Sequence, residues 1–329
     1  MPRVVRFHET GGADVLKVED LPLIEPGEGE VRLKVEAIGL NRAEVMFRRG
    51  QYLQNPELPS RLGYEAAGII NAVGPGIGAI QIGGRVSTIP SFSMGKYGVY
   101  GESAIVPDYA VERYPDQLTA VEGAAIWMQY LTAFGALIEI GQLKKEDSVL
   151  ITAASSSVGL AAIQITKAAG ALAIAATRGA DKKPVLLDAG ADHVIVTDEE
   201  DLAERVLAVT SEKGASMIFD PVAGPLLEKL ADAAASGATL FEYGALSPEP
   251  TPFPLFPAIG KGLTVRGYTL FEIVQDSEKR ARGISYIRDG LQSGALKPII
   301  DRTFPLDAIV DAHRYLESNR QKGKIVVTV

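Results

Sequence analysis

Hydrophobic and polar positions follow two different periods along the chain, and the change falls near residue 118. Up to about residue 115, apolar and polar residues tend to alternate, as in VRLKVEAIGL at 31–40, which is typical of a half-buried strand. Turn-forming clusters such as PGEGE at 26–30 and GPGIG at 74–78 interrupt these runs. The pattern predicts a β-rich N-terminal domain with short connections.

Residues 118–141 have helical spacing, and beyond them short apolar runs alternate with helical segments. The strand candidates are residues 148–154, 171–178, 193–197, 217–222 and 238–244, with helices expected near 182–191 and 201–212. Repeated strand-helix units predict a parallel, doubly wound sheet with helices on both faces. A proline-rich stretch at 246–260 ends this rhythm, and a strand at 263–270, a helix at 276–293 and a strand at 323–329 follow.

We expect an α/β protein in which the tail rejoins the N-terminal domain. The β-rich domain then comprises residues 1–122 and 266–329, and the doubly wound domain comprises residues 123–265. A length of 329 residues agrees with two domains, because a single core rarely grows past roughly 250–300 residues.

Composition narrows the function classes. A formal charge of −8 argues against nucleic acid as a main partner, since binding a phosphate backbone needs a basic face. No apolar run approaches a membrane span, and the N-terminus lacks the apolar core of a signal peptide, so we expect a soluble, cytoplasmic protein without a membrane partner. The chain has no cysteine, and its histidines, at positions 8, 193 and 313, form no closely spaced pair, so we expect no metal site.

The stretch LITAASSSVGLAAIQITKAAGALAIAATR at 150–178 has the order strand, loop, helix, strand of a dinucleotide-binding unit. The first two glycine positions of the usual fingerprint hold Ala154 and Ser156, and only Gly159 remains at the third. Small residues still let the backbone pass close to a phosphate, and the N–H groups of a helix start favour an anion. Tight packing without a ligand is the alternative reading of the same loop.

The end of the next strand indicates which nucleotide binds. AATRGADKK at 175–183 has Thr177, Arg178, Lys182 and Lys183 and no carboxylate at the strand tip, where NAD sites place an acidic residue. This favours NADPH over NADH as the cofactor. Ordinary solvated loop charges are the alternative interpretation.

Several segments together resemble the medium-chain dehydrogenase/reductase superfamily, and in particular its zinc-independent quinone oxidoreductase branch, which includes zeta-crystallin. They are GLNRAEVMFRRGQY at 39–52, LGYEAAGIINAVGPGI at 62–77, WMQYLTAFGAL at 127–137, AASSSVGLAAIQ at 153–164, AGADHVI at 189–195 and GKIVV at 323–327. The resemblance covers essentially the whole chain. It implies a GroES-like catalytic domain and a Rossmann nucleotide-binding domain, and a homodimer formed by pairing edge strands.

The resemblance also implies residue roles. Asn41 and Tyr52 match residues beside the nicotinamide and the substrate. The cofactor contacts that it implies are Asn41, Thr132, Ser156, Ser157, Val158, Thr177, Arg178, Lys182, Tyr243, Gly244, Thr269, Leu270 and Phe271. Zinc alcohol dehydrogenases carry a Gly-His-Glu signature whose histidine binds catalytic zinc, and this chain has Gly63, Tyr64 and Glu65 at those positions.

The expected chemistry is hydride transfer from NADPH to a quinone without zinc. Tyr52 and Tyr64 are candidate donors to the acceptor oxygen, although each could instead be a packed ring, and we interpret Glu44 and Glu65 as structural. An enoyl or alkenal double-bond reductase is the nearest alternative, and a non-catalytic, crystallin-like NADPH-binding protein is the other. Residues 91–102 form either a mobile cover or a surface hairpin.

Overall fold

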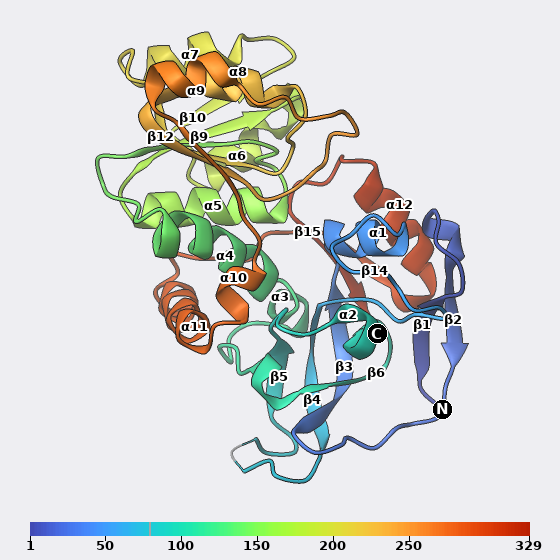
Figure 1. Cartoon of the computed structure of the whole chain (residues 1–329). Helices are drawn as coiled ribbons and strands as arrows, with labels where there is room; N and C mark the ends of the chain where they lie inside the picture. The colour runs from blue at the N-terminus through green and yellow to red at the C-terminus, as the bar shows by residue number, and fades with distance from the viewer. Residues whose placement is uncertain (79) are drawn as a thin grey trace. The chain divides into compact units, whose positions relative to one another are not determined.

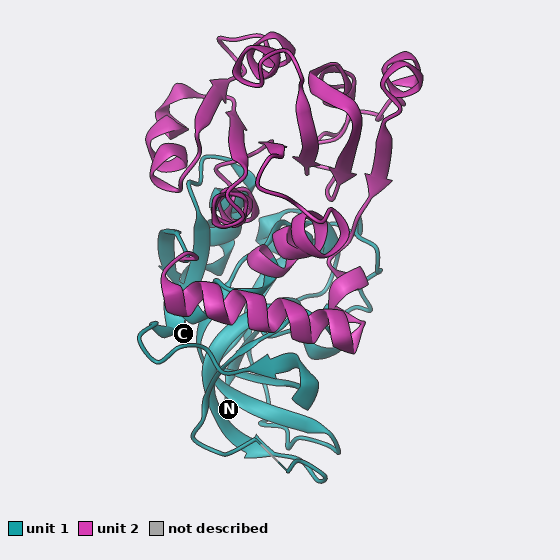
Figure 2. Cartoon of the chain, turned by 90° about the vertical axis from the view of Figure 1, so that its left-hand side faces the viewer, with its two compact units in different colours: residues 1–128, 298–329 teal, residues 129–297 magenta. Residues whose placement is uncertain are grey.

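The computed structural model describes residues 1–78 and 80–329, which form two compact units. Unit 1 comprises Met1–Met128 and Pro298–Val329, and unit 2 comprises Gln129–Lys297, so the second is inserted into the first (Figure 2). Residues 123–128, which we expected in the doubly wound domain, belong to unit 1, and residues 266–297, which we expected in the β-rich domain, belong to unit 2. The reason is packing: β13 (Thr264–Gly267) pairs with β12 (Ala234–Glu242), and Gly283 of α11 (Ser277–Ser293) lies against Leu131 and Phe134.

Unit 1 is built on a seven-stranded sheet in the order β14-β15-β3-β4-β5-β7, with β6 also paired to β3. Its strands are β3 (Glu30–Gly39), β4 (Glu65–Val73), β5 (Arg85–Thr88), β6 (Ser103–Pro107), β7 (Val111–Glu112), β14 (Ile300–Pro305) and β15 (Lys324–Thr328). A separate hairpin joins β1 (Arg3–Phe7) and β2 (Leu16–Asp20). The C-terminal strand β15 lies antiparallel to β3, so the tail completes the N-terminal sheet as expected.

Short helices accompany this sheet. They are α1 (Arg42–Arg48), α2 (Met94–Tyr97), α3 (Ala120–Gly123) and α12 (Ile309–Glu317). Residues 91–102 contain α2 and end in a bridge between Val4 and Gly101, with Met94, Val99 and Tyr100 buried. This segment is therefore packed into unit 1 and is not a hairpin.

Unit 2 contains a six-stranded parallel sheet in the order β10-β9-β8-β11-β12-β13. Besides β12 and β13, its strands are β8 (Ser148–Ile151), β9 (Leu172–Thr177), β10 (His193–Val196) and β11 (Ala215–Asp220). The helices are α4 (Trp127–Phe134), α5 (Ser157–Ala168), α6 (Lys183–Asp188), α7 (Leu202–Val209), α8 (Leu226–Ala233), α9 (Leu255–Lys261), α10 (Phe271–Val274) and α11. The first two residues of α4 belong to unit 1, and α4 runs on into a π-helical turn at Gly135–Ile140. The order reverses between β8 and β11, where doubly wound sheets bind their ligands.

Helices cover both faces of the parallel sheet, with α7 and α8 on one side and α5 on the other (Figure 1). Leu150, Ile174, Ile195, Ile218 and Leu240 from five successive strands pack in one core with side chains of α7 and α8. The strands are apolar because both of their faces are buried, as parallel sheets require. The structure thus confirms the predicted α/β class with a β-rich part and a doubly wound part.

One helical stretch, Ala120–Ile140, is long and apolar enough to cross a membrane by length and composition alone. In the structure, 78% of that window is buried inside the protein. Such burial is what the core helix of a folded domain shows, and its apolar side chains are covered by protein.

Candidate cofactor and catalytic sites

The loop between β8 and α5 turns tightly into the start of the helix despite its serines. Ser156 is the N-cap of α5, and its hydroxyl oxygen accepts a hydrogen bond from the N–H of Gly159 at 3.0 Å. A Cβ atom on Gly159 would lie 2.6 Å from the carbonyl oxygen of Ala154, so only glycine fits this helix-to-loop approach. Serine therefore caps the helix where the fingerprint has its second glycine, and Ser157 and Val158 form the first turn behind it.

The end of β9 lies beside this loop in the sheet. Thr177 closes the strand and is buried, whereas Arg178 follows it and is exposed. Lys182 ends the short 3-10 turn Ala180–Lys182 and is half-buried. An exposed guanidinium at the tip of this strand suits an anion such as a ribose phosphate. The assigned roles of these three residues stay predictions.

The ends of β11 and β12 carry two neighbouring carboxylates, Asp220 and Glu242, which are paired in register. Thr152, which follows β8, donates a hydrogen bond to Asp220, and the N–H of Ala223 donates another at 2.6 Å. Burial, and then the neighbouring Asp220, raises the pKa of Glu242. The raised pKa favours one negative charge on this pair instead of two, close to the loop expected to hold phosphate.

Tyr243 and Gly244 extend β12 toward the same edge of the sheet. The Tyr243 ring stacks on Phe219 with 4.0 Å between ring centroids, and burial raises the pKa of its hydroxyl well above the ordinary value. A Cβ atom on Gly244 would lie 2.8 Å from the carbonyl oxygen of Pro221. Both residues are thus held rigidly, and the nicotinamide contacts expected of them stay predictions.

The remaining unit 2 candidates lie on helices or just before them. Thr132 is buried within α4, Leu270 is buried, and the N–H of Thr269 donates to Glu272 at 3.3 Å.

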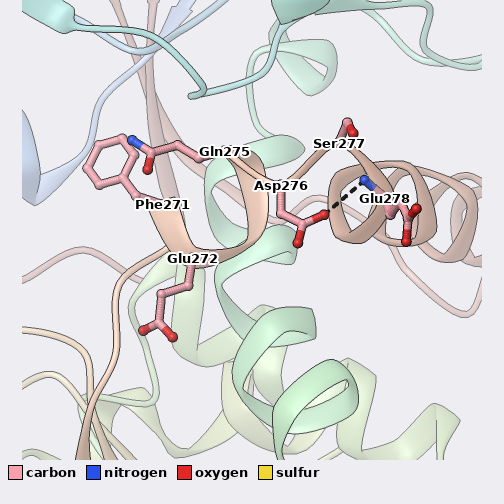
Figure 3. A pocket seen from close by; sticks show the side chains of 6 residues that line it. All are labelled: Phe271, Glu272, Gln275, Asp276, Ser277 and Glu278. Atoms are coloured by element: carbon pink, nitrogen blue, oxygen red, sulfur yellow. Dashed lines mark hydrogen bonds between the residues drawn. The ribbon is translucent and has the colours of Figure 1, made fainter.

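Phe271 lines an open hollow of about 620 Å³ at the junction of α10 and α11, together with Glu272, Gln275, Asp276, Ser277 and Glu278 (Figure 3). Asp276 caps α11 there by accepting from the N–H of Glu278 at 3.0 Å. Three carboxylates in one lining make this hollow unsuitable for the phosphates of a dinucleotide.

In unit 1, Asn41 belongs to a buried polar network. It caps α1 and forms a capping box with Glu44, whose carboxylate accepts from the Asn41 N–H. The Asn41 amide nitrogen donates to Glu44 Oε1 at 3.1 Å, and the amide oxygen accepts from Lys324 Nζ at 2.6 Å. Lys324 also forms an ion pair with Glu65. Sequence reasoning missed Lys324; the only available signal was a lysine at the start of an otherwise apolar terminal strand.

Tyr52 and Tyr64 lie close together in the same unit, and Tyr64 is joined to the Asn41 network. Burial raises the pKa of Tyr52 to about 12 and raises the pKa of Tyr64 further, and each hydroxyl lies near enough to influence the pKa of the other. The N–H of Tyr64 donates to Glu44 Oε1 at 3.2 Å. Burial raises the pKa of Glu44 to about 7 against the opposing effects of Asn41 and Lys324. Asn41 and Tyr64 therefore share the Glu44 carboxylate as a partner, and the catalytic roles of Asn41, Tyr52 and Tyr64 stay predictions.

These residues do not suit a catalytic zinc ion. Where zinc alcohol dehydrogenases have their ligating histidine, this chain has Tyr64, and among residues 1–78 and 80–329 no group of three or more His, Asp or Glu side chains could hold a metal ion. The ammonium of Lys324 between Asn41 and Glu65 would also repel a divalent cation.

Comparison with known proteins gives the family. Two family profiles match: "Alcohol dehydrogenase GroES-like domain" over residues 27–116 and "Zinc-binding dehydrogenase" over residues 189–327. Human quinone oxidoreductase is 32% identical over 333 aligned residues, covering 99% of this chain and 97% of the relative. The chain belongs to the quinone oxidoreductase family of medium-chain dehydrogenase/reductases.

Solved structures agree with this membership. Escherichia coli quinone oxidoreductase complexed with NADPH has a TM-score of 0.91 at 28% identity, covering 99% of this chain and all of that one. An NAD-dependent alcohol dehydrogenase has a TM-score of 0.92 at 31% identity, covering 99% of each chain. The family and the α/β fold predicted from the sequence are confirmed. One of these two structures is described as an NADPH complex and the other as an NAD-dependent enzyme, so the nucleotide preference of this chain depends on its own residues.

Proposed function

We propose that this protein is an NADPH-dependent oxidoreductase that transfers hydride to a quinone without zinc. The observation that carries the proposal is the hydroxyl pair of Tyr52 and Tyr64, with Tyr64 at the position where zinc-dependent relatives have their histidine ligand. Homology to quinone oxidoreductases over nearly the full length supports the reaction class.

The residues of unit 2 suit a dinucleotide phosphate. Ser156, Ser157 and Val158 place the start of α5 behind a tight turn, and the close approach of Gly159 to Ala154 keeps that turn narrow. Arg178 supplies positive charge at the tip of β9, where an adenosine 2′-phosphate is expected. When bound, NADPH supplies the hydride.

The residues of unit 1 would stabilise negative charge on the acceptor. Because the pKa values of Tyr52 and Tyr64 are raised, both hydroxyls stay protonated at neutral pH and serve as neutral hydrogen-bond donors. A donor fixed before the reaction lowers the free energy of an oxyanion that develops during hydride transfer. Such donors take the role that a metal ion has in zinc-dependent relatives, and the final proton comes from water.

The test is a parallel titration with NADPH and NADH of the wild-type protein, of Arg178→Ala and of Arg205→Ala as a matched control. Arg205 lies on α7 of the same unit and pairs with Glu200. We expect Arg178→Ala to weaken NADPH binding by about tenfold or more while NADH binding and the control stay unchanged. Equal affinity of the wild-type protein for both nucleotides would contradict the assignment of the phosphate site.

A second step tests the chemistry with a panel of quinones and enones at saturating NADPH. Oxidation of NADPH by quinones supports the proposal, and turnover confined to enones would assign the protein to double-bond reduction. NADPH binding without any turnover would point to a non-catalytic binding protein.

We also infer a cytoplasmic homodimer. The support is the family resemblance together with β13, which is an edge strand of the parallel sheet and is available for pairing. Size-exclusion chromatography with light scattering tests the dimer, and a monomeric mass would contradict it.

A further inference from the structure

Lys324 is a fully buried lysine whose ammonium has two defined partners. It begins β15, is 1% exposed, donates to Asn41 Oδ1 at 2.6 Å and forms an ion pair with Glu65. The other oxygen of Glu65 accepts from the N–H of Met128 at 2.9 Å, which fixes the carboxylate. A buried charge is costly unless its partners are well placed, so these contacts hold the ammonium in one position.

The contacts of Asn41 determine which way its amide points. Its amide nitrogen donates to Gly39 O at 3.2 Å and to Glu44 Oε1 at 3.1 Å, while its oxygen faces the Lys324 ammonium. An ammonium cannot accept a hydrogen bond and the Gly39 carbonyl oxygen cannot donate one, so a flipped amide would lose its contacts with both Lys324 and Gly39.

Both amide hydrogens of Asn41 are therefore consumed within unit 1. The N–H of Glu44 bonds the main-chain oxygen of Asn41 at 3.3 Å and also faces the Asn41 side-chain oxygen in the capping box. The amide oxygen has two lone pairs, and Lys324 occupies one of them. The side-chain group that Asn41 can still offer a ligand is therefore this oxygen, as an acceptor, because both amide hydrogens are used.

We propose that Lys324 is a positioning residue, which fixes the Asn41 amide so that Asn41 meets its ligand only as a hydrogen-bond acceptor. This inference rests on the proposed function, in which Asn41 contacts the cofactor or the substrate. The group that Asn41 recognises must then be a donor, such as the carboxamide NH₂ of a nicotinamide or a sugar hydroxyl. Asn41 orients such a group and does not donate to the acceptor oxygen, which leaves that task to Tyr52 and Tyr64.

An exchange of donor and acceptor inside the network tests the inference. In Asn41→Asp, a second carboxylate faces Glu44, and we expect kcat/KM to fall about tenfold or more. The double variant Asn41→Asp with Glu44→Gln has the same formal charge as the wild type. In it, the new glutamine amide donates to the aspartate at position 41, and an aspartate oxygen still faces both Lys324 and the ligand. We expect it to recover most of the lost kcat/KM. A double variant as impaired as Asn41→Ala would overturn the proposal.

A double-mutant cycle separates positioning by Lys324 from a merely structural role. Lys324→Met is combined with Glu65→Gln so that no unpaired charge is buried. In the wild-type background we expect this pair to raise the KM for NADPH about tenfold with a smaller change in kcat, and in the Asn41→Ala background to change it less than about twofold. An equal loss in both backgrounds would contradict positioning through Asn41. Melting temperatures measured in parallel report any structural effect of these substitutions. If the Lys324 variant does not fold, the exchange of Asn41→Asp with Glu44→Gln remains the test of the proposal.

The two proposals fail in different ways. A wild-type protein that binds no nicotinamide dinucleotide contradicts the proposed function before any variant is compared. A wild-type protein that binds NADPH and turns over a quinone, but whose exchange variant is not rescued, contradicts only the role of Lys324 and Asn41.

Discussion

His313 of α12 makes the stability of unit 1 sensitive to acid. Its ring is completely buried, with Nδ1 3.2 Å from the Arg48 guanidinium and Nε2 3.3 Å from the Tyr100 hydroxyl. Burial, and then the neighbouring Arg48 charge, lowers the pKa of His313 to about 3 from an ordinary value of 6.5. The ring is therefore neutral in the folded protein at any pH where the fold persists.

The sign and size of the effect follow from proton linkage. The unfolded chain binds a proton at this histidine below pH 6.5 and the folded chain does not, so stability is lost as pH falls from 6.5 toward 3. One pKa unit corresponds to about 1.4 kcal/mol, so the loss is about 2 kcal/mol at pH 5.0 and about 4 kcal/mol at pH 3. Between pH 7.5 and pH 5.0, we expect the free energy of unfolding of His313→Gln to fall by about 2 kcal/mol less than that of the wild type, because glutamine does not titrate.

Urea unfolding followed by tryptophan fluorescence measures this difference. Trp127 is the one tryptophan of the chain, is buried in unit 1 and donates to Ser87 Oγ at 2.8 Å, so its emission reports on the unit that contains His313. His193→Gln, at a half-buried position of β10 in unit 2, is the matched control for the loss of a histidine outside unit 1. If His313→Gln and the wild type lost the same free energy between the two pH values, the reasoning would be refuted.

Three further predictions concern the candidate sites. Gly159→Ala places a Cβ atom 2.6 Å from Ala154 O, so we expect NADPH binding to weaken at least about tenfold in a fluorescence titration; unchanged affinity would contradict the phosphate-loop assignment. Because burial raises the pKa of Glu44 to about 7, the folded state holds a proton that the unfolded state releases above about pH 4.5, and stability falls as pH rises through that window. Glu44→Gln should remove about 3 kcal/mol of this pH-dependent loss in urea unfolding, and an unaltered pH dependence would count against it. Tyr64→Phe should lower kcat with a quinone by about tenfold or more and leave the NADPH dissociation constant unchanged; an unchanged kcat would exclude its hydroxyl as a donor.

The doubly wound sheet could be predicted because its signal is local. From β8 to β11, each strand of unit 2 is a short apolar run followed by a segment of helical period, and this order predicts a parallel sheet with crossover connections. The phosphate loop was also recognisable, since Gly159 stands at the one fingerprint position where a side chain would strike the backbone. Serine at position 156 was ambiguous until the structure placed it as the N-cap of α5.

The domain boundary could not be read from local patterns. The strand and helix at 264–293 follow a proline-rich break and resemble the start of a returning tail. Only pairing of β13 with β12, and packing of Gly283 against α4, assign them to unit 2. Such contacts join residues far apart in the chain, and no periodicity within either segment encodes them.

By itself, the sequence determined the fold class, the family and the absence of cysteine, because these depend on residue identity and on repeats along the chain. Tertiary structure alone decided the polar network of unit 1. Asn41, Glu65 and Lys324 are separated by up to 283 positions, and they meet because β15 pairs with β3 beside β4. Burial in that place is what requires the lysine to be paired and gives the Asn41 amide a single orientation.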